Sequence, residues 1–307
     1  MLRLRPQTAA YAMLALVMLL WAGNSIVGRA VRDDIPPFLL ALLRWTGALL
    51  VIAPFAARHI AADRAVIARK WPVILLLGLL GVAAFNAFLY SGLRFTQASN
   101  GMLLQAAIPA LVLVADFAIF GVRAGPGAML GVALSTIGVV VIVFQGRLGA
   151  LSGLAFNRGD ALILCAVVVW AFYTSLLRLR PALHAQSFLG LTFAIGVLAM
   201  APLAATEWAE IAAMHWTPRV FAAVLYVALL PSVIAYALFN AAVATLGPAS
   251  AGQAITLMPL FGALLAALTL GEQLHGYHFA GMALILGGIV VSAWVRGRSG
   301  TIADARG

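Results

Sequence analysis

The chain has 307 residues, of which 64% are hydrophobic and only 9% are charged. Soluble domains carry roughly 25% charged residues, so this composition excludes an ordinary soluble protein. The net charge of +10 would suggest a nucleic-acid partner in a soluble protein, but in so apolar a chain the placement of the charges is more informative. The sequence predicts an all-α polytopic membrane protein that contacts the lipid bilayer and binds no nucleic acid.

Ten apolar stretches, each bounded by charge, Pro or Gly, are long enough to cross a bilayer, which takes about 20 residues of helix. They cover residues 8–28, 36–57, 72–93, 97–121, 126–145, 159–179, 186–206, 219–246, 249–271 and 275–295. The first follows Arg3 and Arg5 as a signal peptide would, but its apolar part has the length of a full span and ends without a clear cleavage site. The connections are short, so no soluble domain is predicted.

The charged residues divide unequally between the two sides of this ten-span topology. One side holds twelve cations: Arg3, Arg5, Arg58, Arg64, Arg69, Lys70, Arg123, Arg178, Arg180, Arg296, Arg298 and Arg306. The other holds six cations with six acids: Arg29, Arg32, Arg94, Arg147, Arg158, Arg219, Asp33, Asp34, Asp160, Glu207, Glu210 and Glu272. Cytoplasmic loops are enriched in Arg and Lys. We therefore expect both termini in the cytoplasm of a bacterial-type inner membrane.

The sequence repeats itself at a shift of about 150 residues. Matched pairs are Pro109 with Pro259, Gly121 with Gly271, Gly131 with Gly281, Gly138 with Gly288, Trp21 with Trp170 and Arg29 with Arg178. Each half would hold five spans, an odd number, so the second half must enter the membrane from the opposite face. This predicts an inverted repeat. The expected organisation is a first repeat at 1–146, a linker at 147–158, a second repeat at 159–296 and a cytoplasmic tail at 297–307.

Two segments resemble a known family. WAGNSIVGRAV followed by IPPFLLALLRW is similar to the first two helices of EamA-type proteins of the drug/metabolite transporter superfamily, with Arg44 at the position of their usual Arg. LGPASAGQAITLMPLFGALLAALTLGEQLHGYHFAGMALILGGIVV resembles the most recognisable block of that family, although Val122 replaces Glu in the first copy. The resemblance implies ten helices around a central cavity and export of small metabolites. The amino-acid exporters of the YddG type are the most similar branch.

Polar and aromatic residues inside the spans are candidates for the lining of that cavity. Trp21, Asn24, Ser25 and Gly28 share one helix face, and Trp170, Tyr173 and Thr174 repeat the pattern in the second half. Such a stripe faces protein or a water-filled cavity more readily than lipid, and hydrogen bonding between helices is the alternative. The remaining candidates are Arg44, Asn86, Tyr90, Ser99, Asn100, Tyr236, Asn240, Ser250 and Gln253.

Arg44 is the costliest of these residues, because a guanidinium inside a span is penalised by about 2.5 to 3.5 kcal/mol. It would bind the carboxylate of a substrate with its bidentate fork, or serve as a structural anchor that bonds to carbonyls or extends to the membrane surface.

Asp116 is the one carboxylate well inside a predicted span, away from its first and last residues. A buried acid can couple transport to protons, but Arg123 is near in sequence, and pairing with Arg123 at the membrane surface is the favoured prediction.

Two prolines and two rows of small residues concern the packing of the spans. Pro109 and Pro259 are predicted mid-span, where they would free the carbonyls of Gln105 and Ile255 and either hinge a gate or serve packing alone. Gly127, Gly131 and Ser135 on the fifth span, and Ala283 and Gly287 on the tenth, are small residues four apart that favour close helix packing or a dimer face.

Other classes of function fit the sequence poorly. The five histidines lie in loops or at span ends, Asp116 is isolated, and Cys165 is a single mid-span thiol, so no enzyme, metal site or cofactor is predicted. No charged ring or carbonyl filter motif indicates a channel. The sequence predicts a secondary transporter that exports small metabolites, neutral or aromatic amino acids in the first place, by alternating access. Drugs, nucleosides or sugars are the alternative substrates, and a monomer or weak homodimer is expected.

Overall fold

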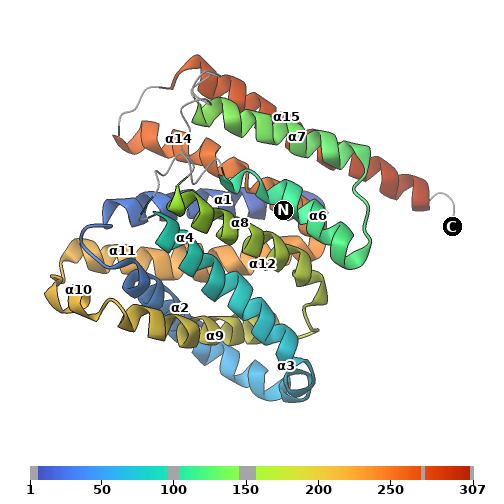
Figure 1. Cartoon of the computed structure of the whole chain (residues 1–307). Coiled ribbons are helices and arrows are strands. Elements are labelled where there is room, and N and C mark those ends of the chain that lie inside the picture. Colours follow the sequence, from blue (N-terminus) through green and yellow to red (C-terminus); the bar gives the residue numbers. More distant parts are fainter. Residues whose placement is uncertain (1–5, 94, 96–103, 145–156, 271–273, 305–307) are drawn as a thin grey trace, which may run out of the picture.

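A computed structural model describes residues 6–93, 95, 104–144, 157–270 and 274–304, and every regular element among them is helical (Figure 1). The elements of the first half are α1 (Pro6–Ala30), α2 (Pro37–Ala62), α3 (Arg64–Gly78), η1 (Leu79–Ala84), α4 (Phe85–Leu93), α6 (Ile108–Phe120) and α7 (Pro126–Val143). Those of the second half are α8 (Arg158–Leu176), η3 (Leu177–Leu179), α9 (Ala185–Ala205), α10 (Trp208–Ala213), α11 (Pro218–Ala228), η4 (Leu229–Ile234), α12 (Ala235–Leu246), α13 (Pro248–Ala254), α14 (Leu257–Leu270) and α15 (Gly276–Asp304).

Seven of the described helices are long and apolar enough to cross a membrane. They run over Pro6–Gly28, Pro37–Ala62, Arg64–Gly92, Arg158–Leu179, Ala185–Ala205, Pro218–Leu246 and Gly276–Val295. Shorter apolar helices at Ile108–Phe120 and Pro126–Ile142 lie in the fourth and fifth predicted spans. The third span begins earlier than predicted, since α3 starts at Arg64, and α15 continues beyond the predicted end of the tenth span to Asp304.

Two six-residue π-helical segments interrupt long spans at matched positions. η1 covers Leu79–Ala84 and η4 covers Leu229–Ile234, a shift of 150 residues at both ends. In η4, Pro231 has no N–H for an α-helical hydrogen bond. In η1, Gly81 allows the Tyr173 ring to approach so closely that a Cβ atom would lie 2.4 Å from it. Different residues therefore produce the same irregularity in the two halves.

The fourth and ninth predicted spans are broken by turns. Residues 106 and 107 form a turn before α6, and Ile255 and Thr256 form one between α13 and α14. Pro109 and Pro259 consequently lie mid-span, but in the first turn of a helix, where proline is tolerated, and not inside a continuous helix; their hinge role stays a prediction. The carbonyl of Ile255 is not free either, because it accepts the Met258 N–H at 2.9 Å.

Helices α7 and α15 lie side by side at one edge of the bundle (Figure 1). A Cβ on Gly138 would lie 2.6 Å from the Gly281 carbonyl oxygen, and a Cβ on Gly131 would lie 2.5 Å from that of Gly288. Since one residue number rises as the other falls, the two helices are antiparallel. The row of Gly127, Gly131 and Ser135 does serve close packing, but its partners are Gly281, Gly288 and Ser292. The predicted packing of Ala283 and Gly287 within the chain was wrong, because Ala283 is exposed and Gly287 has open space around it, and a dimer face at these two residues stays a prediction.

The other helix contacts also occur twice: when the residue numbers of the first half are shifted by about 150, each contact corresponds to one in which the two halves have changed roles. α4 and α6 pack on α8, and α12 and α14 pack on α1. η1 contacts α8 and α9, while η4 contacts α1 and α2. We call the end of the bundle where α6 ends at Phe120 and α8 at Leu176 the Arg178 end, and the end where α9 finishes at Ala205 the Glu207 end. At the Glu207 end, the carboxylate of Glu207 accepts the Phe38 and Leu39 N–H groups of the first turn of α2.

A substitution pair tests the antiparallel contact of α7 and α15. Gly138→Ala should lower thermal stability, because its methyl group would meet the Gly281 carbonyl, and overpacking of this kind costs about 1 to 3 kcal/mol. Gly287→Ala is the matched control and should leave the melting temperature unchanged or raise it slightly, since its site is open. Size-exclusion chromatography after heating measures both, and equal melting temperatures would contradict the packing.

Candidate functional site

A cluster of aromatic rings occupies the centre of the bundle and joins both halves of the chain. The Trp21 ring on α1 lies 5.2 Å from that of Trp170 on α8, in an edge-to-face arrangement. Phe239 lies 5.2 Å from Trp21 and 5.5 Å from Trp170, and Tyr236 lies about equally near to both. Trp45 extends the cluster, with its ring 5.1 Å from Tyr236. All five side chains are buried, so the predicted pair Trp21 and Trp170 does meet.

Arg44 is buried beside this cluster, with 4% of its surface exposed. Its Nε donates to the Ser232 hydroxyl at 2.6 Å, and Nη1 donates to the Tyr90 hydroxyl at 3.2 Å and to Asn86 Oδ1 at 3.5 Å. The guanidinium carbon lies 4.6 Å from the centre of the Trp45 ring. All of these partners are neutral, and no carboxylate of the described residues lies within ion-pairing distance of Arg44. The charge is solvated by dipoles but not neutralised.

A second set of polar contacts also borders the aromatic rings. The Tyr173 hydroxyl donates to Asn240 Oδ1 at 3.2 Å, and Asn240 Nδ2 donates to the Tyr236 carbonyl at 2.8 Å. The Tyr236 hydroxyl reaches across to the first half and donates to the Gly81 carbonyl at 2.6 Å. Asn240 and Tyr236 are one helical turn apart on α12, which is why one side chain can bond to the backbone of the other.

The π-helical segments supply the backbone acceptors for both sets. The Pro231 carbonyl of η4 accepts from Trp21 Nε1 at 3.0 Å and from Arg44 Nη2 at 3.4 Å. At the matched position in η1, the Gly81 carbonyl accepts from Tyr236. A π-helical turn disturbs the regular hydrogen-bond ladder, and such turns are frequent at functional sites. The two interruptions therefore place carbonyl oxygens where the central side chains can use them.

Several buried polar atoms near this centre have no hydrogen-bond partner among the described residues. They are Trp45 Nε1, Trp170 Nε1, Thr174 Oγ1, Ser250 Oγ and Asn24 Oδ1. Thr174 is completely buried and Trp170 is 2% exposed, so solvent at the surface does not satisfy them. Native proteins rarely leave such groups unpaired unless water, an ion or a ligand binds there.

The other predicted lining residues are distributed as follows. Gln253 lies apart from the aromatic cluster, where its amide donates to the Ser135 hydroxyl at 3.3 Å. Ser99, Asn100 and the side chain of Ser25 lie outside the described residues. Three contributors were missed: Trp45, Phe239 and Ser232. The signal for Trp45 was its place next to Arg44, and that for Ser232 was its place beside Pro231 in an apolar span.

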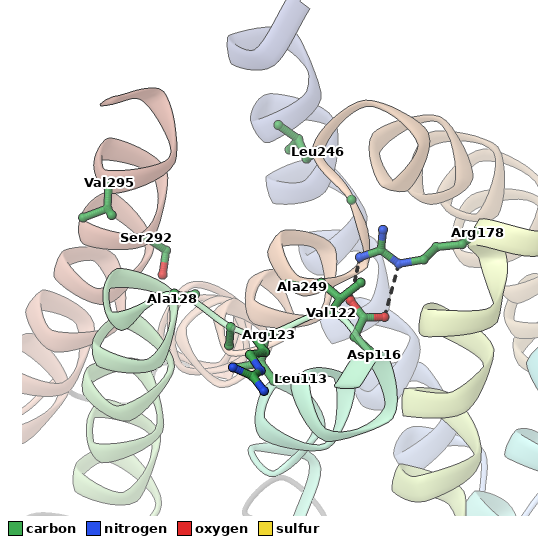
Figure 2. Close-up of a pocket in the computed structure, with 13 residues that line it drawn as sticks. Leu113, Asp116, Val122, Arg123, Ala128, Arg178, Leu246, Ala249, Ser292 and Val295 are labelled. Carbon is green, nitrogen blue, oxygen red and sulfur yellow. Dashed lines mark hydrogen bonds and ion pairs between the residues drawn. The ribbon is translucent and has the colours of Figure 1, made fainter. Parts of the chain in front are cut away.

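Asp116 pairs with a residue far away in the sequence (Figure 2). Arg178 Nη2 donates to Asp116 Oδ2 at 2.7 Å and Nε to Oδ1 at 3.3 Å, and the Ser175 hydroxyl donates to Oδ1 at 2.5 Å. The predicted pairing with Arg123 was wrong, because the side chain of Arg123 points away from the carboxylate (Figure 2). The ion pair joins α6 of the first half to the end of α8 in the second.

No group of three His, Cys, Asp or Glu side chains among the residues searched could hold a metal ion. At the Arg178 end, the rings of His59 and His184 stack 3.5 Å apart, and Asp63 accepts the His184 backbone N–H at 3.0 Å. Hydrogen bonds from Ser187 and from the His184 backbone lower the pKa of the exposed Asp63 carboxyl. These contacts tie the end of α2 to the start of α9.

Comparison with known proteins identifies the class of this chain. The model of the EamA-like transporter family matches it twice, at residues 8–144 and 157–294. The chain is therefore a member of the EamA family of membrane transporters. It is an integral membrane protein and not an enzyme.

Particular relatives match over most of their length. An uncharacterized transporter of Archaeoglobus fulgidus is 30% identical over 92% of this chain and 96% of its own. A probable amino-acid metabolite efflux pump of Salmonella typhimurium is 27% identical over 91% and 93%. A probable terminal-alkyne amino-acid exporter of Streptantibioticus cattleyicolor is 27% identical over 91% of each chain. One solved structure, 23% identical, superposes with a TM-score of 0.71 over 95% of this chain and 98% of the other, which shows the fold.

The contact between the two halves at Tyr236 can be tested by removing one oxygen. Tyr236→Phe should reduce stability by about 1 kcal/mol, because the Gly81 carbonyl loses a buried hydrogen bond while the ring packing remains. Tyr226→Phe is the control, since the hydroxyl of Tyr226 makes only a long contact of 3.4 Å to the Leu20 carbonyl. Heating curves in detergent measure both, and an equal effect of the two substitutions would refute the bridging role of Tyr236.

Proposed function

We propose that this protein is a secondary active transporter that exports small metabolites, neutral or aromatic amino acids in the first place, by alternating access. Two repeats of five spans, residues 1–146 and 159–296, would move against each other around the aromatic cluster. The antiparallel pair α7 and α15 and the matched segments η1 and η4 support an inverted repeat. The relatives named as amino-acid metabolite efflux pump and amino-acid exporter support the substrate class.

The single observation that carries the proposal is the unpaired charge of Arg44. A buried cation with neutral partners alone keeps an unfavourable desolvation energy that a carboxylate would offset. The guanidinium fork can form two parallel hydrogen bonds to a carboxylate, which the hydroxyls of Ser232 and Tyr90 now occupy in part. A free amino acid carries such a carboxylate. The neighbouring rings of Trp21, Trp45, Trp170 and Phe239 provide apolar contact area for its side chain.

Export as the direction of transport rests on the resemblance to exporters, and the proposed orientation assigns the two ends of the route. The excess of Arg and Lys puts both termini and the Arg178 end on the cytoplasmic side of an inner membrane. Substrate would reach the centre from the Arg178 end and leave at the Glu207 end. The unpaired Thr174 hydroxyl can accept from the ammonium group, and the unpaired Trp170 N–H, one turn away on α8, can donate to accompanying water along this route.

Replacement of Arg44 tests the site. In proteoliposomes, Arg44→Gln should weaken substrate binding roughly tenfold to a hundredfold, because one charged hydrogen-bonded pair contributes about 1.5 to 3 kcal/mol. Arg44→Lys should restore part of the affinity, since it keeps the charge and loses the fork. Arg32→Gln is the control, because its side chain is 69% exposed and its ion-pair partner among the described residues is the adjacent Asp33. Wild-type affinity in a well-folded Arg44→Gln protein would remove Arg44 from the site.

A panel of labelled substrates tests the substrate class and the predicted role of Asp116 in ion coupling. Saturable uptake of neutral or aromatic amino acids is expected, and sugars, nucleosides and cationic drugs belong in the same panel. If Asp116 couples transport to protons, uptake should respond to a pH gradient in the wild type and lose this response in Asp116→Asn. Uptake that ignores the gradient in both proteins would end the coupling hypothesis and leave the substrate assignment intact.

A further inference from the structure

A pocket at the Arg178 end lies apart from the aromatic cluster (Figure 2). It has a volume of about 390 Å³ and lies between the end of α6, the start of α7, the α12–α13 connection and α15. Its charged lining residues are Asp116, Arg123 and Arg178. A pocket of this volume is within the range that small-molecule sites occupy.

The charges in this pocket do not balance. Among the described lining residues there are two arginines and one acid, Asp116, and only Arg178 is bonded to that acid. Arg178 donates to Asp116 through Nε and Nη2, and its Nη1 has no partner among the described residues. Arg123 is exposed and forms no ion pair with any described residue. An anion that enters therefore finds unused donors on both arginines.

The ion pair that lines the pocket also holds the two halves together. Asp116 is 2% exposed and belongs to α6, while Ser175 belongs to the last turn of α8 and Arg178 to η3, which follows it. The position 150 residues after Asp116 is Ala266, so the opposite end has no equivalent carboxylate at the matched position. A ligand that takes Arg178 away from Asp116 would loosen the contact between α6 and α8 at this end alone.

Unpartnered polar groups continue inward from the pocket. Thr174 and Trp170 lie one turn apart on one face of α8, and Arg178 follows four residues after Thr174 in the 3₁₀ segment η3. Thr174 Oγ1 and Trp170 Nε1 are both buried and unpaired among the described residues. Ser250 Oγ is also unpaired, directly after the lining residue Ala249 on α13, which packs on α8. Such groups would serve a polar molecule that moves from the pocket toward the aromatic cluster.

We propose that this pocket is a loading site for a small carboxylate-bearing molecule, whose carboxylate binds Arg178 and Arg123 and displaces Asp116. The released Asp116 then accepts the ammonium group of a zwitterion, so a free amino acid satisfies all three charges. Loss of the ion pair separates α6 from α8 and opens the route past Thr174. The inference rests on the proposed function for its place in transport, and its carboxylate chemistry stands on the pocket alone.

Protection of a thiol in the pocket tests this site. Ala128→Cys places a thiol in the lining, in a protein whose native thiol is removed by Cys165→Ser. The purified protein reacts with N-ethylmaleimide in the presence of L-leucine, L-phenylalanine, acetate or inorganic phosphate. Leucinol, which lacks the carboxylate, is the matched control for leucine. We expect several-fold slower reaction with at least one carboxylate and no slowing with leucinol.

Variants distinguish a pocket site from an effect transmitted from the centre. Protection should be lost in Arg178→Gln, weakened in Arg123→Gln and retained in Arg44→Gln. Asp116→Asn should bring protection by acetate, which has no ammonium group to lose a partner, at roughly tenfold lower concentration, which corresponds to about 1.4 kcal/mol, because the competing carboxylate is gone. A purely structural role of Asp116 would not increase the affinity. Arg178→Lys supplies a second variant if Arg178→Gln does not remain monodisperse.

The other possible outcomes either support or overturn the loading site. Protection that disappears in Arg44→Gln and persists in Arg178→Gln would overturn the loading site, and so would slowing by phosphate alone. The absence of protection by every carboxylate would also overturn it, whereas the proposed function would survive if the same amino acids are taken up. Conversely, protection without uptake of any amino acid would support the site and refute the proposed substrates.

Discussion

The constraint on which this structure depends is that hydrocarbon offers no partner to a backbone N–H or carbonyl group. Long helices satisfy it, and the two π-helical segments η1 and η4 are the exceptions that matter. Their carbonyl oxygens at Gly81 and Pro231 are taken by side chains from the opposite half of the chain, Tyr236 in one case and Trp21 with Arg44 in the other. The carbonyl groups of the π-helical segments need donors, and the buried polar side chains need acceptors, so each supplies a hydrogen-bond partner to the other. The centre is polar because the helices are irregular there, and the irregular helices are tolerated because the centre is polar.

The polar groups at the centre hold the Arg44 guanidinium in place but do not neutralise its charge. The hydroxyls of Ser232 and Tyr90, the amide of Asn86 and the Trp45 ring orient toward the guanidinium, so the charge is held in one place at a reduced cost. Neutral dipoles lower the energy of a buried ion without cancelling its charge. A site that holds a charge in position before the ligand arrives loses little energy in reorganisation when a carboxylate binds. The same partners would be poorly explained in a protein that needed only a stable core.

Most of the membrane-spanning helices and the two-fold repeat could be predicted from the sequence, because span length and the 150-residue repeat are properties of residue order. Contacts that depend on how each helix is rotated about its axis could not be predicted in this way. Asp116 was assigned to Arg123, seven positions away, yet it pairs with Arg178, 62 positions away, because helix packing decides which arginine the carboxylate meets. Gly281 and Gly288 form the contact with α7 instead of Ala283 and Gly287, which lie on another face of α15. The π-helical turn at Leu79–Ala84 contains no proline, so only the close approach of Tyr173 to Gly81 accounts for it.

The two ends of the bundle differ although the two halves share one pattern, and the difference lies in single side chains. Asp116 has no matched carboxylate in the second half, so its ion pair with Arg178 has no counterpart at the matched position, and the Glu207 end carries instead the more exposed pair of Arg219 with Asp34. The strength of the pair of Asp116 with Arg178 has to be intermediate. A fully buried pair costs several kcal/mol to break, while an exposed pair contributes less than about 1 kcal/mol. Here the Asp116 side chain is 3% exposed and the Arg178 side chain 36%, so the pair is neither fully buried nor fully exposed. We therefore expect an interaction energy between these two cases. A transporter that returns empty after each cycle must break this contact by thermal motion, whereas a ligand shifts the equilibrium only through a preference for one state. A half-exposed arginine on a buried acid meets both requirements, because the pair holds without ligand and still presents a donor to an arriving carboxylate.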